Sequence, residues 1–310
     1  MIITQENLDQ LRVTFEMRFQ EGYDSAQLWS EKAPFCTDIP SSTEENVYGW
    51  IAQQLRLRKW IGPRIAQNLS EHDYRIRNEP FEGTVEVDRD KIEDDNLGMF
   101  TAVMMPQLGE AVRKHRDVLL EELLLGNPTA FDGEPFYDTA HPTFAPEDQT
   151  QSYSNATALD LSPTALVNVM NEMAIIPGED GRPMGIRPTH LVIPPQLEYT
   201  ARQILHSSTF AAVGVHGDGV VQIENQLKGM LDIVVVPALA DDADRWFLFD
   251  LSKAIKPFVY QKRREPQFVS RDRPDDPKVF DLKKFTYGVD YRAGKGVSLP
   301  FLAYRSVGAG

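Results

Sequence analysis

Apolar residues recur at helical spacing near the start of the chain. Between Asn7 and Glu21 they lie three or four positions apart, at Leu8, Leu11, Phe15 and Phe19. This spacing puts them on one face and predicts a short amphipathic helix. Its apolar face has two open interpretations: burial against a neighbouring subunit, as part of an N-terminal arm, or packing on its own domain.

Between Tyr48 and Asp95 the pattern changes to that of β-strands. Apolar and charged residues alternate for most of the stretch, with Pro80 and Gly83 interrupting. The apolar positions are Tyr74, Ile76, Phe81, Val85 and Val87. The pattern predicts a two-stranded ribbon. Because such a ribbon has no core of its own, it is either a solvated hairpin or an intersubunit strap held by ion pairs.

A long helical pattern follows, from about Met99 to Leu125, and Gly126-Asn127-Pro128 predicts its end. Pro106 either kinks this helix or marks its real first turn. Turn-rich, polar sequence then continues to about Thr157, which favours a domain boundary.

The next part of the chain alternates between helix and strand patterns. We expect a helix N-capped by Ser162-Pro163, a strand at 189–194, a helix at 197–205 and a buried strand at 231–237. This order predicts a compact α/β domain. From Trp246 the chain becomes mainly strand-like, with a long final stretch over about 281–304.

Composition narrows the function classes. The 310 residues are 42% hydrophobic and 25% charged, which is ordinary for a globular protein. A net charge of -14 argues against a surface that binds nucleic acid or anionic lipid by neutralising phosphates. Because Cys36 is the single cysteine, we expect no intrachain disulfide and a reducing compartment. Neither a signal peptide nor a membrane-spanning helix is expected, and no membrane partner.

One cluster has residue types that could bind a metal ion or transfer protons. Asp132, Asp138 and His141 lie within ten residues and have the side chains of a metal site or an acid–base pair. The favoured interpretation is structural, because Gly133 and Pro135 indicate turns that aspartates cap through local hydrogen bonds.

Other candidates have incomplete patterns. His206 and His216 lack the spacing of a helical zinc site, and the glycine-rich run 213–219 lacks the Gly-Lys-Ser/Thr of a phosphate loop. Gly294-Lys295-Gly296 is predicted to be a turn, and Cys36 has no activating neighbour in sequence. We therefore predict that the protein is not an enzyme and has no catalytic, cofactor-binding or metal-binding residues.

Short segments spread over most of the chain carry a family signal. They are Ser-Ser-Thr at 41–43, Tyr-Gly-Trp at 48–50, Trp-Ile-Gly-Pro-Arg at 60–64, Phe-Glu-Gly-Thr-Val at 81–85, Glu-Asp-Asp-Asn-Leu-Gly at 93–98, Tyr-Asp-Thr-Ala-His-Pro at 137–142, Pro-Thr-His-Leu-Val-Ile-Pro at 188–194 and Lys-Pro-Phe at 256–258. In these segments the sequence resembles the Mu-like phage major head subunit family, which has the Hong Kong 97 type capsid fold of tailed phages.

That resemblance implies an α+β fold in five parts. They are an N-terminal arm (1–45), an extended β-ribbon or E-loop (46–97), a peripheral domain with a long spine helix (98–155), an α/β axial domain (156–260) and strands that return to the peripheral domain (261–310). The arm and the E-loop are expected to reach over adjacent subunits.

The implied function is that of a major capsid protein of a bacteriophage or prophage. It is expected to self-assemble into hexamers and pentamers that form an icosahedral shell around double-stranded DNA, without sequence-specific binding and without cofactors. We expect assembly in the host bacterial cytoplasm, into the virion capsid, with separate scaffold, portal and decoration proteins. The alternatives are the shell protein of a cellular encapsulating compartment and a metal-dependent hydrolase that uses Asp132, Asp138 and His141.

Overall fold

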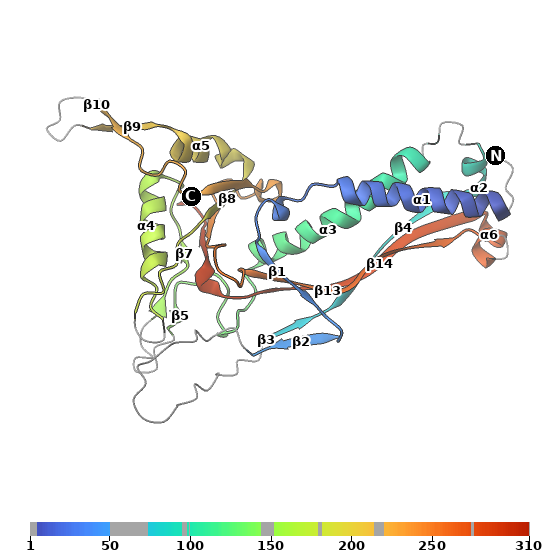
Figure 1. Ribbon diagram of the computed structural model, residues 1–310, viewed down its shortest axis with the longest axis horizontal. Coiled ribbons are helices and arrows are strands. Elements are labelled where there is room, and N and C mark those ends of the chain that lie inside the picture. Colours follow the sequence, from blue (N-terminus) through green and yellow to red (C-terminus); the bar gives the residue numbers. More distant parts are fainter. Residues whose placement is uncertain are drawn as a thin grey trace, which may run out of the picture.

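The computed structural model describes residues 5–49, 74–94, 98, 100–143, 152–178, 182–213, 220–273 and 276–309. Figure 1 shows two parts: an elongated part, in which two helices lie along long strands, and a compact part at the other end. Within the described residues, no helix is both long and apolar enough to cross a membrane.

The elongated part is built on a four-stranded sheet, here called the long sheet. Its strand order is β1 (Cys36–Pro40), β13 (Phe258–Arg271), β14 (Lys284–Val297) and β4 (Glu79–Asp88). β1 runs parallel to β13, and the other neighbours are antiparallel. Helices α1 (Gln5–Ser25) and α3 (Met105–Gly126) lie along one face of this sheet.

Buried aromatic residues alternate along β14, and this explains why α1 and α3 cover one face of the long sheet. Phe285, Tyr287 and Tyr291 are buried at every second or fourth position and point to one side, as strand geometry requires. Phe15 of α1 meets the Tyr287 ring edge-on at 4.8 Å, and Leu119 of α3 belongs to the cluster of Tyr291. The predicted N-terminal helix is therefore confirmed, and it packs on its own subunit.

Two glycines allow α1 and α3 to come unusually close. A Cβ atom on Gly109 would lie 2.0 Å from the Phe19 carbonyl oxygen, and one on Gly22 would lie 2.0 Å from the Pro106 carbonyl oxygen. Real Cβ atoms do not approach backbone so closely, so the two helices are in contact through their main chains at both positions.

The long predicted helix is confirmed, with a modified start. A π-helical turn over Phe100–Met104 leads into α3, and Pro106 lies in the first turn of α3, where its missing N–H costs no hydrogen bond. The sequence left open whether Pro106 kinks the helix or marks its first turn, and the structure shows that it marks the first turn. The short helices α2 (Arg89–Glu93) and α6 (Pro277–Leu282) lie at the far end of the elongated part.

The compact part contains a five-stranded sheet. Its order is β11 (Asp232–Val235), β8 (His190–Ile193), β12 (Trp246–Phe249), β15 (Ala303–Ser306) and β7 (Ala156–Thr157). Helices α4 (Pro163–Ile175) and α5 (Glu198–His206) also belong to this part. The Ser162 hydroxyl accepts a hydrogen bond from the Ala165 amide, as the predicted N-cap requires. Two hairpins complete it, β5 (His141–Pro142) with β6 (Ser152–Tyr153), and β9 (Thr209–Val213) with β10 (Val220–Glu224).

The two parts share a hydrophobic core. Leu120 and Leu124 from the second half of α3 pack in one cluster with Phe247 and Phe249 of β12. Neighbouring residues of the same strands, such as Leu248, face a second cluster with α4 and α5. The compact sheet is therefore buried on both faces, and α3 connects it firmly to the elongated part.

The predicted ribbon is wrong as a single two-stranded unit. β3 (Tyr74–Arg77) pairs with β2 (Glu45–Tyr48), whereas β4 pairs with β14, so the two predicted strands do not pair with each other. β4 also has a core, because Val87 is buried in the cluster of Phe15 and Tyr287. The alternating pattern was correct, but strand pattern does not specify the pairing partner.

Candidate functional site: the ribbon base and the N-terminal anchor

The aspartate and histidine cluster forms a structural pair. His141 Nδ1 lies 2.7 Å from Asp132 Oδ2, with both side chains buried, and the imidazole stacks on Tyr153 at 5.0 Å. Asp138 instead accepts a hydrogen bond from the Ala140 amide at 2.8 Å, which is a turn-capping contact. The described residues contain no group of three or more side chains suited to a metal ion. The geometry fits the turn-capping interpretation.

The remaining sequence candidates differ in where they lie, and the glycine-rich run falls outside the described residues from 214 to 219. His206 is the exposed last residue of α5, and His216 lies outside the described residues. Burial raises the pKa of the Cys36 thiol to about 12, which is the opposite of activation. The predicted turn at Gly294-Lys295-Gly296 is wrong, because all three residues lie inside β14.

Gly294 and Gly296 instead allow a second layer to approach the long sheet. This layer is the pair of strands β2 and β3, here called the ribbon base. A Cβ atom on Gly296 would lie 2.4 Å from Ile76 Cδ1, and one on Gly294 would lie 2.6 Å from Gln261 Nε2. Alternate glycines in a strand are a recognisable signal for such close approach, and sequence reasoning missed it. The ribbon base crosses the face of β14 opposite to α3, because α3 packs against Ala293, which precedes Gly294, and pairs with Lys295 between the two glycines.

Buried amides hold the ribbon base on the sheet. The Gln261 amide nitrogen donates to the Ile76 carbonyl at 3.0 Å, and its oxygen accepts from the Tyr48 hydroxyl at 2.9 Å. Asn78 donates to Ser41 Oγ at 2.7 Å, and the Tyr74 hydroxyl accepts from the Val297 amide at 3.0 Å. Since these hydrogen bonds are buried or part-buried, they hold the base in a fixed position on the sheet.

Ion pairs cross the two strands of the base. Arg77 pairs with Glu44 at 2.7 Å and Arg75 with Glu45 at 3.3 Å. All four side chains are largely exposed, so these pairs contribute little to stability and serve mainly to specify register. Residues 50–73, which link the two strands in sequence, lie outside the described residues.

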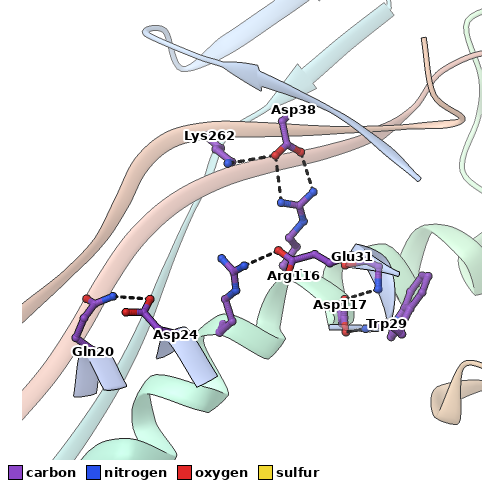
Figure 2. A network of polar contacts seen from close by, with 10 residues as sticks. Gln20, Asp24, Trp29, Glu31, Asp38, Arg116, Asp117 and Lys262 are labelled. Atoms are coloured by element: carbon purple, nitrogen blue, oxygen red, sulfur yellow. Dashed lines mark hydrogen bonds and ion pairs between the residues drawn. The ribbon is translucent and has the colours of Figure 1, made fainter. Parts of the chain in front are cut away.

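A second polar network anchors the N-terminal segment to α3 (Figure 2). The buried Asp117 carboxylate accepts hydrogen bonds from the Trp29 amide at 2.9 Å and the Ser30 amide at 3.3 Å. The Trp29 indole donates to Glu121 at 2.9 Å. Asp117 therefore caps the start of the 3₁₀ turn Trp29–Glu31 with a side chain from another helix.

The same network fixes β1 to the sheet. Figure 2 shows Asp38 between two cations: both terminal nitrogens of Arg116, at 2.8 and 3.2 Å, and Lys262 at 3.1 Å. The Arg116 guanidinium also lies over the Tyr260 ring, 4.8 Å from its centroid. Sequence reasoning missed Asp38, Arg116 and Asp117, because charged residues that meet across the fold have no local pattern.

Neither network contains an arrangement for bond-making chemistry. Both fix segments of the main chain to the elongated part, and the hairpin β9–β10 projects from the compact part (Figure 1). A rigid body with a projecting hairpin is compatible with a subunit that joins its neighbours through extended contacts.

Comparison with known proteins agrees with this architecture. The procapsid protein of bacteriophage JBD30 superimposes with a TM-score of 0.59 at 27% identity, covering 98% of this chain and 76% of the other. The major capsid protein of Escherichia phage Mu is 26% identical over 96% of this chain and 72% of its own length. The Mu-like prophage FluMu major head subunit of Haemophilus influenzae is 27% identical over 95% of this chain and 71% of its own length.

The fold is thus the α+β capsid fold of phage shell proteins, as the sequence predicted. The family model described as Mu-like prophage major head subunit gpT matches residues 8–164, 156–239 and 238–309. The chain belongs to this family of major head subunits. It is a structural protein of a tailed phage head, and the prediction that it is not an enzyme is confirmed by the family and the fold.

Proposed function

We propose that the protein assembles into hexamers and pentamers that close into an icosahedral shell around double-stranded DNA. The observation that carries the proposal is the family match along residues 8–309. Many modest contacts per subunit then act together when the shell closes. Neither alternative from the sequence, a compartment shell or a hydrolase, gains support from the relatives.

The subunit divides accordingly in this proposal. The long sheet with α1 and α3 serves as the peripheral domain, and the compact part with its β9–β10 hairpin serves as the axial domain. The ribbon base and residues 50–73 serve as the E-loop, and β4 belongs to the peripheral sheet. Scaffold, portal and decoration proteins are separate chains, and assembly takes place in the host bacterial cytoplasm.

Expression followed by light scattering and negative-stain microscopy tests the proposal. Closed shells, rings or tubes of many subunits are expected, from the chain alone or with a scaffold protein. A chain that stays monomeric under both conditions contradicts the proposal. Shells that contain a cargo protein, and that never package DNA in infected or induced cells, indicate the compartment alternative instead.

A further inference from the structure

A small cavity lies between the two helices of the elongated part and the long sheet. It has a volume of about 70 Å³, and residues of α1, α3, β13 and β14 line it. A buried water molecule needs about 10–15 Å³ of such space, so the cavity has room for an ion of several heavy atoms. Because elements distant in sequence meet at this cavity, an occupant would contact both helices and both strands.

Positively charged side chains dominate the lining of the cavity. Five of the lining residues are cations, although the whole chain has a net charge of -14. They are Arg113, Arg116, Lys262, Arg264 and Arg292. The lining also contains the exposed Glu265, and the carboxylates that pair with these cations are Glu31, Asp38 and Asp290. Among the lining residues and their ion-pair partners, cations therefore outnumber carboxylates.

Arg292 is the cation of this set that has no carboxylate partner among the described residues. One of its terminal nitrogens donates to the Asn78 carbonyl oxygen at 3.3 Å. Its Nε atom is buried and has no hydrogen-bond partner. Since a buried N–H group without an acceptor is destabilising, the Arg292 guanidinium is suited to an additional acceptor with negative charge.

The strand pairing beside the cavity is irregular. Arg264 of β13 and Arg292 of β14 are directly opposite partners, and the register of the pairing shifts on both sides of Arg264. Like charges in directly opposite positions destabilise a sheet. Bulges are frequent beside active sites, where they redirect a side chain. An anion close to both arginines would offset their repulsion, which makes this irregular pairing consistent with an anion site.

The chemistry of the lining favours a phosphate group over other anions. Guanidinium groups bind phosphate oxygens through paired N–H donors. Tyr23 and Tyr260 also line the cavity, and phenol hydroxyls can donate to the same oxygens. The small volume suits a free phosphate ion or a terminal phosphate. A phosphodiester of a DNA duplex carries a sugar on either side and does not fit.

We propose that the cavity between α1, α3, β13 and β14 binds a phosphate ion, or the terminal phosphate of a small molecule, through Arg264 and Arg292. The bound phosphate links the two helices to the two central strands of the long sheet and stabilises the folded subunit by mass action. The lining residues all come from one copy, so the site does not depend on assembly into a shell.

Thermal unfolding of the full chain in inorganic phosphate tests the proposal. The reference buffer contains sodium chloride at the same ionic strength and pH. With about 20 mM phosphate and a dissociation constant of about 1 mM, the midpoint temperature should rise by about 3–5 °C. Arg264→Gln and Arg292→Gln each remove one guanidinium, and a tenfold loss of affinity would reduce the rise about threefold.

The matched control is Arg202→Gln on α5, an exposed arginine that also pairs with a single carboxylate, Glu198, far from the cavity in sequence. It should keep the full rise in midpoint temperature. The Arg264 side chain is 42% exposed, so Arg264→Gln should fold even if Arg292→Gln does not. Circular dichroism in the reference buffer verifies that each variant is folded.

Two results of this experiment would overturn the proposal. One is a wild-type midpoint in phosphate that equals the midpoint in chloride. The other is an equal rise in the wild type, the control and the folded pocket variants, because phosphate then acts only by its general exclusion from protein surfaces.

A comparison of phosphate sources tests the size of the ligand. A nucleoside monophosphate should stabilise the chain as inorganic phosphate does, whereas a short DNA duplex with unphosphorylated ends should not. Stabilisation by the duplex that Arg264→Gln and Arg292→Gln abolish would assign these cations to a nucleic-acid backbone and would overturn the proposed small phosphate ligand.

Discussion

Replacing Gly109 by alanine tests whether α1 is held against α3 at main-chain distance. The new Cβ atom would lie 2.0 Å from the Phe19 carbonyl oxygen and 2.7 Å from the Tyr23 amide nitrogen. Since such contacts are essentially never shorter than 3.0 Å, the helices must separate by about 1 Å. The obstacle is backbone, so no side-chain rotation relieves the clash.

The expected change in the free energy of unfolding follows from two opposing effects. Overpacking of a well-packed interface destabilises by about 1–3 kcal/mol, and the upper part of this range applies because α1 must move as a unit. Alanine in place of glycine favours the helix by about 1 kcal/mol. We therefore expect Gly109→Ala to lower the free energy of unfolding by about 1–2 kcal/mol, the difference between these two effects.

Urea unfolding of the isolated subunit, followed by circular dichroism, measures this change. Gly126→Ala is the matched control, because Gly126 ends the same helix and a Cβ atom there meets nothing within 4 Å. It should be neutral or slightly stabilising. The Gly22→Ala/Gly109→Ala double variant should be less destabilised than the sum of the single variants, since one separation of the helices accommodates both Cβ atoms. Equal stability of Gly109→Ala and Gly126→Ala would refute the reasoning.

Four further predictions concern the anchors and the buried groups. Gly294→Ala should break the hydrogen bond from Gln261 to the ribbon base and speed amide hydrogen exchange at 74–77, whereas unchanged exchange would contradict the close approach. Asp117→Ala should lower stability by about 1–3 kcal/mol, because two buried amides lose their acceptor; a wild-type urea midpoint would count against this. Burial raises the pKa of Asp272, so folding favours its protonated form, and Asp272→Asn should stabilise the subunit at pH 7. That gain should vanish as the pH falls below the ordinary pKa of the carboxyl group, and a gain independent of pH would exclude this origin. Cys36 should react with a thiol reagent only when the chain unfolds, as timed reaction at pH 8 would show.

Much of the local structure was predictable because it depends on neighbouring residues. The spacing of Phe15 and Phe19 specified α1, the Ser162-Pro163 cap specified the start of α4, and Asn127 ends α3 in the left-handed conformation that the Gly-Asn-Pro stop indicated. The turn-capping role predicted for Asp138 likewise involves an amide only two residues away. The family segments also lie in the sequence, and they led to the fold before any tertiary contact was known.

The tertiary structure decided which elements meet. β3 and β4 have the same alternating pattern, yet one pairs with β2 and the other with β14, because pairing is chosen by burial across the whole fold. Gly294 and Gly296 suggested a turn locally, but they are strand residues that make room for the ribbon base. Asp117 accepts a hydrogen bond from the amide of Trp29, which lies 88 positions earlier in the chain. Hydrogen bonds and packing act over a few ångströms in space, so contacts between residues distant in sequence have no local pattern and only the folded chain determines them.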